Sequence, residues 1–255
     1  MLFSEFENKI NEIIINDNSP IVAHISCWPI FLKLKKNDID TAKKILNSLK
    51  RLASGRGLLM PTFSTGYKNG LCDLDNEKSS TGIISELFRV EKNSTRTLSA
   101  FFSYSTQGQI AEEIKDIMAH EAWGEGSVYD WMEKKDTTFL LIGTSPTHIS
   151  YIHRFEWLFR DKINYRYRKE FTGTIIRKGK RYNMKEQLFV RNLSPEAIMD
   201  FSPLEKIILA SKMKKSESQI PIYSIKCSDL RNSLVPIFNS NPTILLKNKK
   251  DFQCQ

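Results

Sequence analysis

The sequence is poor in cysteine and histidine, the residue types on which disulfide-rich folds and zinc sites depend. Its 255 residues include four of each, with no C-x-x-C pair and no spacing typical of a zinc site. A chain of this length buries roughly 70–75% of its unfolded surface, so it needs neither disulfides nor a structural metal to fold. We therefore expect reduced thiols, no metal and a cytoplasmic protein.

Long apolar runs are also missing. The most apolar stretch, 21–32, is interrupted by histidine, serine, cysteine and proline, and it is much shorter than the ~20 residues of a membrane helix. The first 14 residues carry three glutamates, whereas a secretion signal has a basic segment followed by a long apolar run. We expect neither export nor a membrane span.

Glycine is scarce, with 11 residues, and none of them forms a phosphate-binding loop. The segment Gly55-Arg56-Gly57 lacks the Lys-Ser/Thr of a P-loop and the third glycine of the dinucleotide fingerprint. This absence argues against a nucleotide hydrolase.

Acidic residues are scarce in the C-terminal third. Residues 160–255 contain 20 Lys and Arg against 9 Asp and Glu, whereas residues 1–159 contain 18 against 20. One alternative function is therefore a non-enzymatic protein that binds nucleic acid or another anion through residues 160–255, including the basic segment 177–181. We favour an ordinary solvated surface, because the aromatic residues are spread along the chain and form no compact stacking platform with Lys and Arg.

The spacing of apolar residues alternates between helical and strand periods, which is typical of an α/β fold. It predicts helices over 3–14, 38–53, 81–89, 107–120, 129–133, 150–159, 204–214 and 229–238. Short apolar runs predict strands from residue 21 and over 58–60, 137–142 and 222–225, with a hairpin over 169–190. No repeat or low-complexity linker divides the chain, so we expect one domain, 1–255. Ligands of open α/β sheets bind at the carboxyl ends of the strands.

His153 and Glu156 are the sharpest candidates for a catalytic pair. On a helix, residues three apart lie on one face, close enough for the carboxylate to orient and support the imidazole. Such support makes the imidazole a better general base. The spacing alone is also typical of an ordinary surface or core-edge pair.

Cys27, close to His24 at the end of the first strand, is a second candidate, as an acyl-accepting nucleophile. A buried thiol that acts as a small apolar side chain is the more common situation. His120 and His148 have no carboxylate at helical spacing, so we expect surface or loop roles for them.

Seven segments together resemble the aminoglycoside 3-N-acetyltransferase family. In order, they are Ile21-Val-Ala-His-Ile-Ser-Cys27, Leu58-Leu-Met-Pro-Thr-Phe63, Thr81-Gly-Ile-Ile-Ser-Glu-Leu-Phe-Arg89, Thr95-Arg-Thr97, Ala122-Trp-Gly-Glu-Gly-Ser-Val-Tyr129, Leu140-Leu-Ile-Gly143 and Ser150-Tyr-Ile-His-Arg-Phe-Glu156. Their order and spacing match the family over about residues 20–170.

The resemblance implies an α/β/α sandwich around a mixed central sheet, with acetyl-CoA as co-substrate and an amine of a sugar-type acceptor. It places His153 and Glu156 at the family's His-x-x-Glu position. It also implies a set of donor-binding residues near the pantetheine, the phosphates and the oxyanion, namely Ser26, Cys27, Thr62, Phe63 and Arg96. We expect direct transfer, in which His153 takes a proton from the attacking nitrogen and no acyl-enzyme forms.

The sequence departs from the family pattern around the acceptor. Ser99 replaces a histidine, Ser150 replaces the threonine of Thr-x-x-His, and a bulky segment, 28–31, replaces a glycine-rich one. The small-molecule acceptor is thus either an aminoglycoside, implying antibiotic resistance, or an amino sugar. An amino-sugar acceptor would be free or nucleotide-linked and would indicate a role in polysaccharide synthesis. The basic C-terminal third favours an anionic acceptor, although coenzyme A alone accounts for such a surface. A homodimer is compatible with this interpretation.

Overall fold

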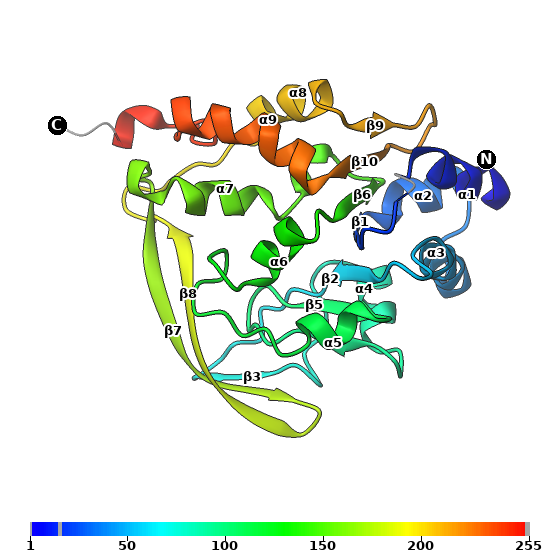
Figure 1. Cartoon of the computed structure of the whole chain (residues 1–255), viewed down its shortest axis with the longest axis horizontal. Helices are drawn as coiled ribbons and strands as arrows, with labels where there is room; N and C mark the ends of the chain where they lie inside the picture. The colour runs from blue at the N-terminus through cyan, green and yellow to red at the C-terminus, as the bar shows by residue number, and fades with distance from the viewer. Residues whose placement is uncertain (1, 15–16, 253–255) are drawn as a thin grey trace.

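The computed structural model describes residues 2–14 and 17–252; Cys254 lies outside them. A seven-stranded mixed sheet in the order β4-β5-β2-β1-β6-β10-β9 forms its centre (Figure 1). β1, β2 and β6 are parallel, and the flanking strands are antiparallel. The strands are β1 (Ile21–Ile25), β2 (Leu58–Pro61), β4 (Thr95–Arg96), β5 (Tyr104–Gln107), β6 (Thr138–Ile142), β9 (Lys214–Lys215) and β10 (Ile222–Lys226).

Helices cover both faces of this sheet. Side chains alternate along each strand, so Val22 packs into one core while Ile21 and Ala23 pack into the other. The core with Ile21 and Ala23 includes α1 (Phe3–Ile13), α2 (Cys27–Leu34), α3 (Ile39–Leu52) and α4 (Ile83–Arg89). The core with Val22 includes α5 (Ile110–Ile114), α6 (Val128–Lys134), α7 (Ile152–Leu158), α8 (Ser202–Ala210) and α9 (Cys227–Ser240). The predicted α/β/α sandwich around a mixed sheet is confirmed.

A long hairpin lies beside the sandwich. β7 (Arg166–Arg177) and β8 (Lys180–Arg191) pair along their whole length and form a second sheet with β3 (Leu71–Asp73). The hairpin runs down one side of the molecule (Figure 1). Its turn, Lys178-Gly179, has positive φ at both residues, as a tight hairpin with right-handed strand twist requires. The hairpin predicted over 169–190 is therefore present and longer than predicted.

Several sequence-based elements were wrong. The helix predicted over 107–120 is only α5, because Gln107 belongs to β5 and pairs with Leu58. The bulky segment 28–31 lies within α2, which was not predicted; Pro29 is tolerated there because it is in the first turn. The helix predicted to reach residue 214 ends at Ala210, and Lys214 begins β9. β3 lies in segment 66–80, for which no helix or strand was predicted.

The carboxyl ends of the three parallel strands meet at one edge of the sheet. β1 ends at Ile25, β2 at Pro61 and β6 at Ile142. Gly143, with φ of 69°, follows β6 so closely against β1 that a Cβ there would lie 2.3 Å from the carbonyl oxygen of Ser26. This edge is where a ligand is expected.

Three short helical turns complete the described chain: η1 (Pro146–His148), η2 (Arg160–Lys162) and η3 (Lys249–Phe252). Across the described ranges, no helix has the length and apolar character that crossing a membrane requires.

Candidate active site

The pair predicted from spacing forms on α7, just beyond the carboxyl end of β6. Nδ1 of His153 lies 2.6 Å from Oε2 of Glu156. The carboxylate is 1% exposed, whereas the imidazole side chain is 29% exposed. The helix thus buries the carboxylate and leaves the imidazole partly exposed.

Three groups donate hydrogen bonds to the buried carboxylate of Glu156. Besides His153, the hydroxyl of Tyr165 donates to Oε1 at 3.0 Å, and Nε of Arg166 donates to the same oxygen at 2.6 Å. Burial alone would raise the pKa of this carboxyl group. The charge of Arg166 and the hydrogen bonds from His153 and Arg166 outweigh burial and bring the pKa of Glu156 to about 2. Glu156 is therefore ionised at any physiological pH.

The ionised carboxylate fixes which nitrogen of His153 carries the proton. An anion accepts a hydrogen bond, so Nδ1 is the protonated nitrogen of the neutral ring and Nε2 keeps its lone pair. Within the described residues, no hydrogen bond to Nε2 is found. The ring packs between Trp123 and Phe201, with centroid distances of 5.8 and 5.9 Å. The imidazole is thereby held in one tautomer and one orientation.

A cavity of about 340 Å³ opens at His153. Its lining residues carry hydroxyl, imidazole and apolar groups and no carboxylate: Thr147, His148, Ile149, Ser150, His153 and Phe201. Ser99, which stands where the family has a histidine, does not line this cavity.

Arg154 anchors α7 between its two candidate residues. It is buried and forms ion pairs of 3.0 Å with Asp130 and Glu133 of α6, and it also donates to the carbonyl of Trp123. Asp130 also holds the preceding loop by accepting from the backbone N–H of Gly126 at 2.9 Å. The geometry of the pair therefore rests on a rigid support.

Ser26 and Cys27 lie where β1 ends and α2 begins. The backbone N–H of Ser26 donates to Ile142 at 2.9 Å, so this N–H is unavailable to an oxyanion. Burial raises the pKa of the Cys27 thiol to about 11, although the backbone N–H of Ile84 partly offsets it. A thiol this weakly acidic is protonated at neutral pH, which argues against its use as a nucleophile.

His24 and His148 lie close enough to interact. His24 is buried on β1, and its Nε2 has no partner among the described residues. Burial, followed by the charge of His148, lowers the pKa of His24 to about 4. His24 is therefore a neutral core residue. His148 is exposed in η1, where its Nδ1 lies 3.0 Å from Oγ1 of Thr144. His120 is also exposed and pairs with Glu170 on β7.

Thr62 and Phe63 follow β2 and differ in accessibility. Thr62 is fully buried, and both its N–H and its hydroxyl donate to the carbonyl of Ser103, at 2.9 and 3.2 Å. Phe63 is half-buried and packs edge-to-face on Tyr104, whose hydroxyl reaches Ser150. The end of β2 is thus connected to the wall of the His153 cavity.

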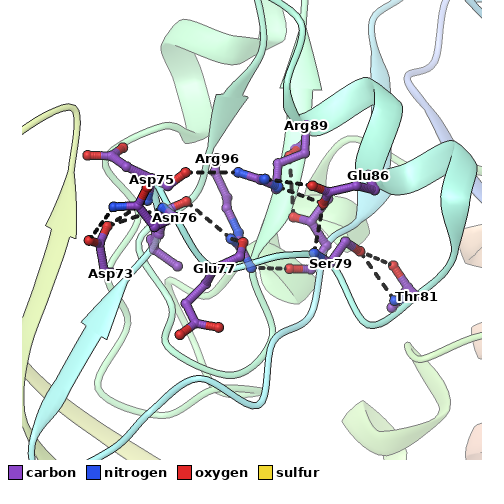
Figure 2. Close-up of polar contacts among 12 residues, drawn as sticks. Asp73, Asp75, Asn76, Glu77, Ser79, Thr81, Glu86, Arg89 and Arg96 are labelled. Carbon is purple, nitrogen blue, oxygen red and sulfur yellow. Dashed lines mark hydrogen bonds and ion pairs between the residues drawn. The ribbon is translucent and has the colours of Figure 1, made fainter.

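Arg96 lies on β4 below the surface, where its guanidinium binds the chain itself (Figure 2). Nε donates to Oγ of Ser103 at 2.8 Å, and the other nitrogens donate to the carbonyls of Leu74, Glu77 and Thr62. Burial, followed by repulsion from the nearby Arg89, lowers the pKa of Arg96 to about 10. In this arrangement, the guanidinium holds the loop 74–77 against β2.

Ser99, which replaces the family histidine, contacts the hairpin. Its hydroxyl donates to Oε1 of Glu186 at 2.6 Å, and the backbone N–H of Ala100 donates to Oε2 at 3.0 Å. Glu186 is 4% exposed, and burial raises its pKa to about 6 in spite of these hydrogen bonds. The sequence departure at position 99 therefore coincides with a buried carboxylate that no cation neutralises among the described residues.

Sequence reasoning missed Tyr104, Tyr165 and Arg166, which contact Ser150 or Glu156. It also missed Glu186, which contacts Ser99. Each comes from another strand or loop, so no local spacing marks it. The alternation of side chains along the hairpin was only a weak signal for Arg166, because it does not show which hairpin residue contacts α7.

The comparisons agree with this fold. The family model for aminoglycoside 3-N-acetyltransferase matches residues 39–234. No curated protein sequence matches the chain. Similar solved structures include apo aminoglycoside acetyltransferase AAC(3)-IVa, with 17% identity, coverage of 99% of this chain and 93% of that chain, and a TM-score of 0.71.

Two further solved structures are complexes with ligands. AAC-IIIb, a binary complex with CoASH, has 12% identity, coverage of 94% and 97%, and a TM-score of 0.73. A variant of AAC(3)-IVa in complex with gentamicin has 18% identity, coverage of 100% and 94%, and a TM-score of 0.72. These likenesses show a shared fold.

The fold and the matched segment define an N-acetyltransferase, an acyltransferase class that takes its acetyl group from acetyl-CoA. The chain belongs to the aminoglycoside 3-N-acetyltransferase family, because the family model covers most of its length.

Proposed function

We propose that the chain transfers an acetyl group directly from acetyl-CoA to an amine of an aminoglycoside-type amino sugar, with His153 as general base and Glu156 as its positioning carboxylate. The observation that carries the proposal is the 2.6 Å contact between the two side chains, together with the position of the His153 ring in the lining of the 340 Å³ cavity. Among the residues that the structure describes, none forms a hydrogen bond with Nε2 of this ring. Similar enzymes have been solved with CoASH and with gentamicin, which supports the substrate classes.

The chemistry follows from the protonation states. The lone pair of the amine attacks the thioester carbon, and Nε2 of His153 accepts the proton that the nitrogen loses. The buried charge of Glu156 stabilises the resulting imidazolium. Collapse of the tetrahedral intermediate breaks the carbon–sulfur bond, and the departing thiolate takes the proton back from His153. General-base assistance of this kind is typically worth about 10²–10⁴-fold.

We place the donor at the carboxyl ends of β1 and β2, beside Ser26, Cys27, Thr62 and Phe63. Support comes from the position of these strand ends next to α7 and from the unpaired N–H groups expected at the start of α2. Arg96, predicted from the resemblance to contact coenzyme A, is left out of the proposed donor site, because its guanidinium binds backbone carbonyls.

A second acceptor class, a nucleotide-linked amino sugar, is favoured by two observations. The cavity lining has no carboxylate for a polycation, and residues 160–255 are strongly basic. An acceptor of this kind would indicate polysaccharide synthesis, whereas an aminoglycoside acceptor would indicate antibiotic resistance. The cytoplasmic location and the homodimer stay predictions.

The single domain, 1–255, is supported by one core that joins residues from Val22 to Leu246. The non-enzymatic alternative is set aside, because the family is one of enzymes. Arg177 of the basic segment, moreover, is buried and paired with Asp116 at 2.6 Å.

A thiol-release assay with acetyl-CoA tests the proposal. Acceptors are an aminoglycoside panel and a panel of free and nucleotide-linked amino sugars. Turnover confined to aminoglycosides supports the first acceptor class, and turnover confined to nucleotide-linked sugars supports the second. If no amine in either panel supports thiol release, the proposed function is contradicted.

A further inference from the structure

One buried phenol beside the site has no part in the chemistry described so far. Tyr104 on β5 is fully buried, yet its hydroxyl oxygen lies 2.6 Å from Oγ of Ser150. Ser150 lines the cavity together with His153. The backbone N–H of His153 also donates to the carbonyl of Ser150 at 3.2 Å, so the two residues are one helical turn apart.

We propose that Tyr104 is a positioning residue that donates its proton to Ser150 and so turns the Ser150 hydroxyl hydrogen towards the cavity, where it stabilises the oxyanion of the acetyl-transfer intermediate. The inference rests on the proposed transferase function. It gives Ser150 a catalytic role and Tyr104 an indirect one.

The distances decide where the phenolic proton goes. A phenol has one hydroxyl proton to donate. Among the described residues, the hydroxyl oxygen of Tyr104 lies 2.6 Å from Oγ of Ser150 and 3.4 Å from the hydroxyl oxygen of Tyr129. The shorter contact is the stronger hydrogen bond, so we assign the proton to Ser150. Burial, together with the neighbouring Tyr129, raises the pKa of Tyr104 well above its ordinary value. The phenol therefore stays protonated and remains a donor.

Ser150 has one hydrogen of its own to place. Once its oxygen accepts from Tyr104, that hydrogen has two acceptors in reach: the hydroxyl oxygen of Tyr129 and an oxyanion in the cavity that Ser150 lines. The oxyanion is the stronger acceptor, because it carries a negative charge. A hydroxyl aimed before the reaction begins stabilises developing negative charge without having to reorient.

The surroundings hold Tyr104 in place. Its ring packs edge-to-face on Phe63 and Tyr129, with centroid distances of 5.5 and 5.8 Å. Its backbone N–H donates to Oγ1 of Thr97 at 2.9 Å. A phenol packed on a strand in this way cannot follow Ser150 if the serine rotates, so it selects one serine rotamer.

The expected effects differ in size. Ser150→Ala removes an oxyanion donor and lowers kcat by about 10²–10³-fold. Tyr104→Phe removes a hydrogen bond to that donor and lowers kcat by about 3- to 10-fold, with KM for both substrates unchanged. Ser150→Thr keeps the hydroxyl and retains most of the activity.

A double-mutant cycle tests the proposal. Tyr104→Phe is expected to lower kcat in the wild-type and Ser150→Thr backgrounds but to have no further effect in the Ser150→Ala background, because its only route to the reaction is then gone. Tyr129→Phe is the matched control for the loss of a buried phenol beside Ser150, since it keeps the contact between Tyr104 and Ser150. Its kcat should fall less than that of Tyr104→Phe, and an equal or larger fall would overturn the assignment to Tyr104. Thermal unfolding confirms that each variant is folded.

The cycle also separates this inference from the proposed function. Equal losses from Tyr104→Phe in the Ser150→Ala and wild-type backgrounds, or no loss in either, would overturn the positioning role. His153→Ala is measured in parallel: if that variant keeps full activity, the general-base mechanism itself is wrong, whatever the cycle shows.

Discussion

Arg166 binds the same carboxylate that supports the base: its Nε lies 2.6 Å from Oε1 of Glu156, while His153 occupies Oε2. The buried negative charge is therefore shared between a permanent cation and a transient one. Arg166 neutralises Glu156 while the imidazole is neutral, and it limits how strongly the carboxylate favours the imidazolium. The arrangement keeps His153 able both to take a proton and to return it.

Two substitutions in this cluster are expected to shift the pH profile in opposite directions. Glu156→Gln removes the anion that favours the imidazolium, so the acidic limb of kcat/KM moves to lower pH and kcat falls at least ~10-fold. Arg166→Gln leaves the anion without its cation, so the same limb moves to higher pH. Because the pKa of Glu156 is about 2, titration of this carboxylate does not contribute to the pH profile of kcat/KM above pH 4.

Both variants break a buried ion pair, which costs about 3–5 kcal/mol of stability. General structural damage would therefore affect them alike, and only the electrostatic account predicts opposite shifts. Measured kcat/KM profiles that move in the same direction would contradict it.

Direct transfer predicts that Cys27 carries no acetyl group. Its pKa of about 11, raised by burial, keeps the thiol protonated at pH 7. Initial-rate kinetics should be sequential rather than ping-pong, and mass spectrometry of the enzyme with acetyl-CoA alone should show no acetylated protein. Cys27→Ser should keep kcat within about threefold. An acetylated intermediate that disappears in Cys27→Ser would support the nucleophile alternative.

Arg96 is expected to matter for stability and not for coenzyme A. Arg96→Ala leaves three backbone carbonyls and Ser103 without their donor, and should lower the free energy of unfolding by about 3 kcal/mol. The neighbouring Arg89→Ala is a matched control, because its pair with Glu86 is more exposed and should cost about 1 kcal/mol or less. Urea unfolding measures both. If Arg96→Ala raises the KM for acetyl-CoA tenfold and leaves stability unchanged, Arg96 contacts coenzyme A and the structural role is wrong.

The sequence allowed the contact between His153 and Glu156 to be predicted because both residues belong to one helical turn. The order of helices and strands likewise followed from apolar periodicity, and the central strands β1 and β6 were found for that reason. Partners that come from distant segments could not be found in this way: Arg166 approaches Glu156 from the hairpin. β5 was missed because its sequence, Tyr104-Ser-Thr-Gln107, is largely polar and forms a strand through pairing with β2 and β4.

Glu186 gives the protein a stability component that depends on pH. Burial raises its pKa to about 6 in the folded state, above the ordinary 4.5 of the unfolded chain. The folded state therefore binds the proton more tightly. This contribution is complete below pH 4.5, and it is lost as the pH rises through 6.

The loss amounts to about 2 kcal/mol. Urea unfolding at pH 4.5 and pH 8 should show it in the wild type, and Glu186→Gln should lack it. The charge-neutral variant is expected to be the more stable protein at pH 8. Equal pH dependence in both proteins would show that Glu186 titrates normally.

The account depends most directly on the imidazole of His153. Thiol release from saturating acetyl-CoA, measured for wild type and His153→Ala with an acceptor found in the panels, should fall by about 10²–10⁴-fold while the Tm stays close to wild type. Added free imidazole should restore part of the lost rate. A folded His153→Ala that turns over within threefold of wild type would contradict the claim that this residue is the general base.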